Sequence, residues 1–393
     1  MWKHALRCAS VAWLAAIVPR AAVAASLWQD PAVHTAPQSA AIERFAEQIA
    51  TDVKQDDVGA ITAGVFVGSE IVWAQGFGWA DRNRHIAADA NTIYRVGSIS
   101  KSFTALLMAQ LAARNVLDID KPLTDYLPEA QRLAGGADTL AGVTLRRLAS
   151  HTAGLIREPE LPRAAAGPIA LWEDKVVASI PTTAFLAGPG ERYSYSNIGF
   201  GMLGLAISRT AGRPFMDLVT EYIVEPLEMK QTVFVMTPEL YPHLAVGYSV
   251  SGDGTTSPDF PALEHWGRGY KVPNGGIYST VDDLARFAGA ITGTSAVEIL
   301  PAEWRREMMR VQTPESPIAG YGLGLALRTG ESGVRMVGHG GGVAGYNAYL
   351  IFDPVSKVGM VLLRNYNRGN TNLGRSAAML LEELVQEGMG QRK

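Results

Sequence analysis

The chain contains the run Gly97-Ser98-Ile99-Ser100-Lys101-Ser102-Phe103, and apolar residues continue from it at helical spacing. Residues three apart on a helix share a face, so this spacing brings Ser98 beside Lys101. A hydroxyl next to an amine is a nucleophile next to a base, provided that the lysine is neutral. Burial and the positive end of a helix both disfavour the charged form of lysine. The run therefore predicts a nucleophile and its base at the start of a buried helix.

A simpler interpretation of the same residues stays open. Ser98 would cap the helix and Lys101 would be a solvated side chain in its first turn. The apolar run from Phe103 to Leu111 indicates that the helix is buried, which favours the catalytic interpretation.

A second candidate motif places a tyrosine and an amide together in the turn-rich segment 188–197. A tyrosine near a cationic lysine loses its proton more easily, so Tyr195 could carry a proton to a leaving group. Asn197 can hydrogen-bond both a lysine and a substrate amide. Alternatively, Tyr195 only packs and Asn197 caps the helix expected at residues 198–208.

A third candidate motif joins two expected strands and reads His339-Gly340-Gly341-Gly342-Val343-Ala344-Gly345-Tyr346. Consecutive glycines let a substrate approach backbone N–H groups, which could complete an oxyanion hole. His339 adds a donor whose charge changes near neutral pH. If its imidazolium binds a substrate carboxylate, affinity should weaken as the pH rises past about 6.5. The alternative is a flexible glycine turn with an incidental histidine.

The order Ser-x-x-Lys, Tyr-x-Asn, His-Gly-Gly resembles the serine β-lactamase-like superfamily, specifically its class C β-lactamase and D-aminopeptidase branch. The resemblance extends through residues 148–155, 190–197, 275–280 and 321–324 and covers nearly the whole chain after residue 25.

The resemblance implies roles for the motif residues. Ser98 would be the acylated nucleophile, Lys101 its activating partner and Tyr195 the proton carrier. Substrate binding would fall to Asn197, His339, Gly340 and Gly341, and the oxyanion hole to the backbone N–H groups of Ser98 and Gly342.

The third motif departs from the β-lactamases of this branch, which have Lys-Thr-Gly where this chain has His339-Gly340-Gly341. The pattern is closer to D-aminopeptidases, some D,D-peptidases and esterases. The lysine that helps to hold a β-lactam carboxylate is missing, and histidine is protonated only in part at pH 7. The resemblance therefore favours acyl transfer over robust β-lactamase activity.

Strand patterns gather at the two ends of the chain and helical patterns lie between them. Strands are expected over residues 60–67, 71–79, 334–338, 346–352 and 357–364, the first two as a hairpin around Gly68-Ser69-Glu70. Helices are expected over residues 41–55, 98–111, 198–208 and 281–291. This order predicts an α+β fold of the serine β-lactamase type, with an antiparallel sheet built from both chain ends and flanked by helices.

The same patterns suggest how the chain is divided. Residues 26–110 and 281–393 are expected to form a sheet subdomain, and residues 111–280 a mainly helical subdomain inserted into it, with the active cleft between them. The Pro- and Gly-rich stretches 157–181 and 251–276 are long for structureless connections, and such loops rim a site or are mobile.

The N-terminus has the layout of a secretory signal peptide over residues 1–25. Lys3 and Arg7 precede the apolar run 9–18, and small residues follow it, so cleavage is expected near Ala24 or Ala25. The apolar run is about half of the roughly 20 residues that a membrane anchor needs. The only cysteine, Cys8, would be removed, which excludes disulfides and a cysteine nucleophile from the mature chain. We therefore expect a periplasmic or secreted protein with no stable membrane span.

Composition excludes several other classes of function. The 393 residues carry 35 Lys+Arg against 38 Asp+Glu without a basic run, so nucleic acid is not an expected partner. The glycine patterns at 199–204 and 340–345 lack the setting of a dinucleotide site. The histidines show no metal-ligand spacing, so we expect no metal and no cofactor. His151 is expected to be structural, because buried histidines bonded to backbone are commoner than catalytic ones.

Together these observations predict an exported serine hydrolase that acts through an acyl-Ser98 intermediate on an amide or ester. The substrate would be a small molecule or a short peptide. Two alternatives stay open: a low-efficiency class C-like β-lactamase, and a non-catalytic penicillin-binding-type receptor. The sequence does not rank ester, D-amino-acid amide, peptidoglycan peptide and β-lactam substrates, and it does not reveal the oligomeric state.

Overall fold

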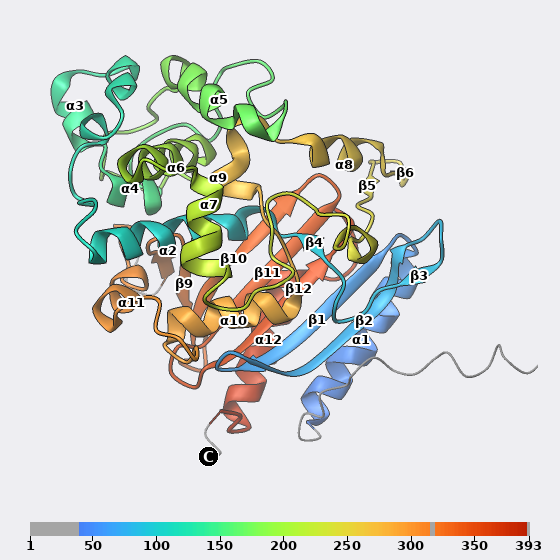
Figure 1. Ribbon diagram of the computed structural model, residues 1–393. Helices are drawn as coiled ribbons and strands as arrows, with labels where there is room; N and C mark the ends of the chain where they lie inside the picture. Colours follow the sequence, from blue (N-terminus) through green and yellow to red (C-terminus); the bar gives the residue numbers. More distant parts are fainter. Residues whose placement is uncertain (1–38, 315–318, 391–393) are drawn as a thin grey trace, which may run out of the picture. The chain divides into compact units, whose positions relative to one another are not determined.

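Strands from both ends of the chain meet in one sheet, as a computed structural model that describes residues 39–314 and 319–390 shows. The predicted signal peptide, residues 1–25, lies outside the described residues. The sheet has eight antiparallel strands in the order β3-β2-β1-β12-β11-β10-β9-β8 (Figure 1). Its two halves join where β1 pairs with β12, Ile61 opposite Arg364 and Val67 opposite Val358. The predicted α+β fold is therefore confirmed.

The strands of this sheet are β1 (Ala60–Val67), β2 (Glu70–Asp81), β3 (Ile86–Ala87), β8 (Ala319–Tyr321), β9 (Ala326–Thr329), β10 (Arg335–Val343), β11 (Tyr346–Phe352) and β12 (Val358–Arg364). Two small ribbons pair β4 (Tyr94–Arg95) with β7 (Tyr278–Ser279) and β5 (Ser249–Val250) with β6 (Thr256–Ser257).

The α-helices are α1 (Ala40–Asp56), α2 (Ser100–Ala113), α3 (Ala137–Gly142), α4 (Leu145–Ala149), α5 (Trp172–Ser179), α6 (Asn197–Ala211), α7 (Phe215–Val219), α8 (Asp259–Leu263), α9 (Val272–Gly275), α10 (Val281–Thr292), α11 (Ala302–Met308) and α12 (Leu373–Gln386). Short 3-10 turns are η1 (Gly97–Ile99), η2 (Leu123–Asp125), η3 (Pro128–Arg132), η4 (Ile169–Leu171), η5 (Ile180–Thr182), η7 (Tyr241–His243), η8 (Glu264–Trp266) and η9 (Gly269–Lys271), and η6 (Thr220–Val224) is a π-helical turn.

The four predicted helices correspond to α1, α2, α6 and α10. Local capping explains where α1 and α10 begin. The Ser39 side chain accepts a hydrogen bond from the Ile42 N–H, and Thr280 accepts one from Asp283. At the C-terminal end of α10, Gly293 adopts a left-handed φ of 76°, which glycine does without strain.

The structure differs in local detail from what the sequence patterns showed. The sequence patterns did not reveal β8 and β9, which are only three and four residues long. The strand expected at 334–338 continues to Val343, so the glycine run lies within β10 and not in a loop. The stretches 157–181 and 251–276, which are long for structureless connections, contain short helices: α5 in the first, and α8 and α9 in the second. In α5, Trp172 and Val176 are buried at helical spacing.

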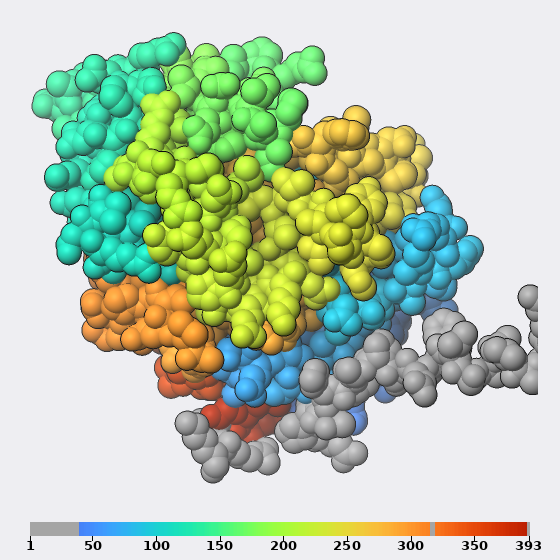
Figure 2. Space-filling model, viewed as in Figure 1, coloured from blue at the N-terminus to red at the C-terminus, as the bar shows by residue number. Residues whose placement is uncertain are grey.

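Both faces of the sheet are covered by helices. Strand alternation sends Met360 and Leu362 of β12 into one core with α1 and α12, while Val361 and Leu363 enter the other core, which contains α2 and α10. Gly64 of β1 lets α10 approach closely, because a Cβ there would lie 3.0 Å from Cβ of Val281. In the space-filling view, the green and yellow middle of the chain covers the upper part of the visible face (Figure 2).

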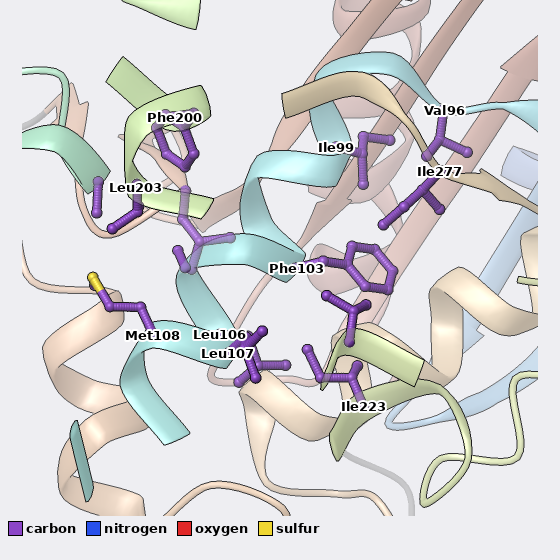
Figure 3. Packing of buried hydrophobic residues seen from close by; sticks show 14 of the residues in the cluster. Val96, Ile99, Phe103, Leu106, Leu107, Met108, Phe200, Leu203, Ile223 and Ile277 are labelled. Carbon is purple, nitrogen blue, oxygen red and sulfur yellow. The ribbon is translucent and has the colours of Figure 1, made fainter. Parts of the chain in front are cut away.

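Helix α2 lies in the larger core and is buried around its whole circumference, from Ser100 to Ala112. Its Phe103 ring stacks on Phe287 of α10 with ring centroids 3.9 Å apart. Figure 3 shows Phe103 and Met108 among apolar side chains such as Phe200, Leu203 and Ile277. Such a helix is held by packing on all sides, so the residues at its start have fixed positions.

The described residues, 39–314 and 319–390, belong to one compact unit, and the division into a sheet and a helical subdomain stays a prediction. In the part of the chain that the structure describes, no helix is long and apolar enough to cross a membrane.

Replacing Phe103 with alanine should lower the free energy of unfolding by about 3–5 kcal/mol, because it removes a fully buried ring that stacks on Phe287. Urea denaturation followed by circular dichroism measures this. The control is Phe260→Ala, at a ring that is 60% exposed. It should alter the free energy of unfolding by less than about 0.5 kcal/mol. Equal losses in the two variants would contradict the central role of α2.

Candidate active site

Ser98 and Lys101 meet at the start of α2, as their spacing predicted. Ser98 lies in the turn η1 that leads into the helix, and the Lys101 amine is one turn further on and fully buried. Lys101 Nζ lies 3.1 Å from Ser98 Oγ, 2.7 Å from Asn197 Oδ1 and 3.3 Å from the carbonyl oxygen of Asn274. Three segments far apart in the sequence therefore converge on one amine.

The surroundings of Lys101 favour its neutral form. Burial is the largest cause that lowers the pKa of Lys101 well below its usual range, and the charges of Arg157, Arg268 and Lys271 lower it further. A neutral amine has two hydrogens and one lone pair. The two oxygens of Asn197 and Asn274 can only accept, so they take the two hydrogens and leave the lone pair for the Ser98 hydroxyl. The geometry thus fits a base that is ready to accept the Ser98 proton.

Tyr195 completes the cluster from the loop that precedes α6. Its side chain hydrogen-bonds Ser98, and its ring lies beneath Lys101 Nζ, 4.7 Å from the ring centroid. Burial is the main cause that raises the pKa of Tyr195, although the Ser98 hydrogen bond and the charge of Arg157 lower it. The expectation that this phenol loses its proton easily is therefore wrong. Tyr195 keeps its proton beside the neutral Lys101 amine, so it can act as a proton donor.

Asn197 is the first residue of α6 and does not cap it. The cap is Ser196, whose Oγ accepts the Gly199 N–H at 3.0 Å. The Asn197 amide accepts from Lys101 and donates through Nδ2 to Glu158 Oε1 at 2.6 Å. Contact with a substrate amide, which the sequence predicts, would therefore use the second hydrogen of Nδ2.

Glu158 is a part of the site that the sequence analysis missed. Its carboxylate accepts hydrogen bonds from Asn197 and Tyr270 and pairs with Lys271 at 3.0 Å. Burial raises the pKa of Glu158, but these hydrogen bonds and the charge of Lys271 together lower it, so it is ionised. The available signal was the charged pair Arg157-Glu158, which follows the 148–155 motif after one residue. Only the fold brings it to Asn197.

The glycine run of β10 lies against the turn that carries Ser98. β9 begins at Ala326, opposite Gly338, so the residues of β10 after Gly338 have no partner in β9 and η1 packs against that edge. A Cβ on Gly341 would lie 1.9 Å from the Val96 carbonyl oxygen, and one on Gly97 would lie 2.7 Å from the Gly342 nitrogen. The backbone of β10 and the backbone of the turn η1 are therefore in direct contact, with no side chain between them. This contact is what an oxyanion hole from Ser98 and Gly342 requires.

His339 does not serve as an imidazolium. Its Nδ1 lies 2.5 Å from the Gly340 carbonyl oxygen, which can only accept, so Nδ1 carries the hydrogen. Nε2 then accepts from the Tyr321 hydroxyl at 2.7 Å. Burial is the main cause that lowers the pKa of His339 to about 3. The expectation of a carboxylate-binding cation is wrong, because the ring is neutral and both of its nitrogens are bonded.

Ser98 and Tyr195 open onto a cleft with a volume of about 860 Å³. Its wall includes His339, Gly340, Gly341 and Gly342, then residues 347–349 and 367–374. Arg157, Arg364 and Arg368 line it without any aspartate or glutamate, so the described wall is positively charged. Among residues 39–314 and 319–390, no group of three or more histidines, cysteines or carboxylates could hold a metal ion.

The chain is similar to several known proteins. The family model described as Beta-lactamase matches residues 45–383. The human putative beta-lactamase-like 1 is 27% identical over 85% of the chain, which spans 66% of the length of that protein. The Escherichia coli K12 D-alanyl-D-alanine-carboxypeptidase/endopeptidase AmpH is 25% identical over 72% of the chain and 73% of its own length. A solved D-stereospecific amidohydrolase from Streptomyces sp. has a TM-score of 0.71 at 24% identity, with 88% of this chain and 98% of that chain covered.

Gly341→Ala should slow acylation of the site by at least about a hundredfold, because the new Cβ would push β10 away from the turn that carries Ser98. The control variant is Gly136→Ala, which lies outside the site at φ -75° and whose Cβ would meet no atom within 4 Å. Rates of covalent labelling by an activated ester compare the two. Equal rates would show that the close contact is unimportant.

His339 should stay neutral between pH 5 and pH 8, because burial holds its pKa near 3. Ring-nitrogen NMR, assigned with His339→Asn, measures this. Folding lowers the pKa of His339. Its neutral ring therefore contributes fully to the free energy of unfolding above the unfolded pKa of about 6.5, and this contribution is lost as the pH falls towards 3. A titration midpoint near 6.5 would instead support a His339 imidazolium that binds a substrate carboxylate.

Proposed function

The chain belongs to the beta-lactamase family, and from this premise we propose that it is a serine hydrolase that opens an amide or ester through an acyl-Ser98 intermediate. The observation that carries the proposal is the buried Lys101 amine, within 3.1 Å of Ser98 Oγ and bonded to two oxygens that can only accept. This is a base whose lone pair faces the nucleophile. A merely structural lysine would need its charge paired at this depth.

In the proposed acylation step, Lys101 Nζ takes the proton from Ser98 Oγ while Oγ bonds to the substrate carbonyl carbon. The carbonyl π electrons move to oxygen, and the negative charge is held by the backbone N–H groups of Ser98 and Gly342. Both donors belong to backbones packed against each other, so they need no rearrangement when the charge appears.

The tetrahedral intermediate collapses when the bond to the leaving group breaks. Tyr195 is protonated, because burial raises its pKa, and it gives its proton to the departing nitrogen or oxygen. The protonated Lys101 returns a proton to Tyr195, which restores the neutral amine. Water then attacks the acyl-Ser98 ester, and the same groups run in reverse to release the acid.

We favour amides or short peptides with a D-configured residue as substrates. The names of two similar proteins support this: AmpH is a D-alanyl-D-alanine-carboxypeptidase/endopeptidase, and the Streptomyces enzyme is a D-stereospecific amidohydrolase. The β-lactamase alternative is weakened because His339 stands where a lysine would hold the carboxylate and both of its nitrogens are already bonded. Esters remain substrates that the same chemistry would accept.

We also propose that the protein is exported, with residues 1–25 removed near Ala24 or Ala25 and the mature enzyme in the periplasm or the medium. The support is the charge and hydropathy pattern of residues 3–25. A peptide or small molecule from the cell envelope would then be within reach.

Ser98→Ala should abolish covalent adduct formation, because it removes the only atom that forms the acyl bond. Intact-mass spectrometry after rapid quenching with a D-alanyl amide, simple esters and a penicillin measures this. Ser102→Ala is the matched control: Ser102 lies on the same helix, but its hydroxyl donates to the Gly324 carbonyl, away from Ser98. That variant should keep the adduct.

Lys101→Ala should lower turnover by several orders of magnitude, since nucleophile and base act as a unit. Lys121→Ala removes an exposed lysine and should leave turnover unchanged. Unchanged turnover in Lys101→Ala would contradict the proposal. An adduct that forms on the wild-type protein and is never released would identify the penicillin-binding receptor instead.

A further inference from the structure

His151 is a buried histidine beside the active site that the proposed mechanism does not use. It is 1% exposed and follows the short helix α4. Its Nδ1 accepts the backbone N–H of Ser196 at 3.0 Å. Its ring packs on the Tyr195 ring, with centroids 4.2 Å apart and planes tilted by 36°. One imidazole therefore holds both the Tyr195 ring and the backbone N–H of the next residue.

Two energetic costs are present at this residue. His151 has a left-handed φ of 58°, which is uncommon for residues other than glycine. Because Nδ1 accepts a hydrogen bond and burial lowers the pKa of His151 well below its usual range, the ring is neutral and its hydrogen lies on Nε2. Nε2 has no hydrogen-bond partner within residues 39–314 and 319–390. If packing were the only role of residue 151, an apolar side chain would fill the space without leaving a buried N–H unbonded.

The His151 ring is enclosed by aromatic side chains that lead to the third motif. Phe200 and Tyr321 have ring centroids 5.0 Å and 4.8 Å from it. The Tyr321 hydroxyl is bonded to His339 at the start of the glycine run. A single stack of rings thus connects the loop of Tyr195 with the strand that carries the candidate oxyanion hole.

We propose that His151 is a positioning residue, which aims the Tyr195 hydroxyl at Ser98 by fixing the Tyr195 ring and the Ser196 N–H together. This rests on the proposed function, in which Tyr195 delivers the proton to the leaving group. The ring contact with Tyr195 and the hydrogen bond from the Ser196 N–H together fix the orientation of the Tyr195 ring. A loop held by its backbone alone would let the phenol rotate away from Ser98.

Several polar groups also face Tyr195. Ser98 hydrogen-bonds its hydroxyl, Lys101 Nζ and the Arg157 guanidinium lie 4.7 Å and 4.8 Å from the ring centroid, and His339 lies 6.3 Å from it. Glu158 raises the pKa of Tyr195 and Arg157 lowers it, but burial is the largest cause of its raised value. Removal of the covering imidazole would admit water, so the Tyr195 pKa should fall towards its usual value of about 10.

The test is His151→Asn in the full chain. Asparagine tolerates the left-handed φ and offers an amide oxygen to the Ser196 N–H, so the variant removes the ring and keeps the loop. We expect kcat to fall about ten- to a hundredfold with a smaller change in KM. The alkaline limb of the pH–rate profile should move to lower pH. His151→Gln, which also carries an acceptor, replaces it if the asparagine variant does not fold.

The matched control is His85→Asn, at an exposed histidine with a similar φ of 53°, which should leave kcat and KM unchanged. A readout independent of turnover is the titration of Tyr195 in ring-labelled tyrosine NMR, assigned with Tyr195→Phe. Its midpoint should fall in His151→Asn. A folded His151→Asn with wild-type kcat and an unchanged Tyr195 midpoint overturns the proposal.

A loss of activity that matches a loss of acylatable protein, with an unchanged pH profile, also overturns the proposal, because it marks a purely structural histidine. If the wild-type protein forms no adduct with any compound, the proposed function fails. The Tyr195 titration then still decides whether His151 holds that ring.

Discussion

A fully buried lysine without a carboxylate in contact is the constraint on which the site depends. Within the described residues, the Lys101 amine has only the Ser98 hydroxyl, the Asn197 amide oxygen and one backbone carbonyl as close polar neighbours. A charged amine at this depth would be costly, so the environment selects the neutral form. The helix that carries it must be buried on all sides, and α6 and α9 must approach it closely enough to supply oxygens. Nucleophile, base and proton donor follow from that packing.

The same low-polarity environment sets the charge of the other groups around the serine. Burial raises the pKa of Tyr195 and lowers the pKa of His151 and of His339, so the phenol keeps its proton and both imidazoles stay neutral. Each neutral ring then has a defined tautomer, fixed by the Ser196 N–H in one case and by the Gly340 carbonyl in the other. Positive charge on the cleft wall comes from Arg157, Arg364 and Arg368. An incoming substrate therefore meets cations on the wall of the cleft and a neutral acid–base pair beside Ser98.

The sheet contributes by bringing a bare backbone to the serine. β10 extends beyond its pairing with β9, and three successive glycines let that free edge lie directly on the turn before α2. A side chain at Gly341 would collide with backbone, whereas Gly342 is open to the cleft. The long loop through Glu158 and the helix α9 approach the amine from other directions, so the centre is assembled from five separate stretches of chain. These stretches all lie in the one compact unit to which the described residues belong.

The sequence by itself determined the α+β class, the strands β1, β2, β11 and β12, the helices α1, α2, α6 and α10, and the motif residues that meet around Ser98. These features have local causes, namely periodic burial, caps and turns. It did not determine β8 and β9, which are too short to show a period, or the continuation of β10 through glycines that are typical of turns. It also missed Glu158 and misjudged the charge of His339 and the acidity of Tyr195. Only the tertiary structure decided these, because desolvation and ion pairing come from residues far away in the chain, and no local pattern records how deeply a group will be buried.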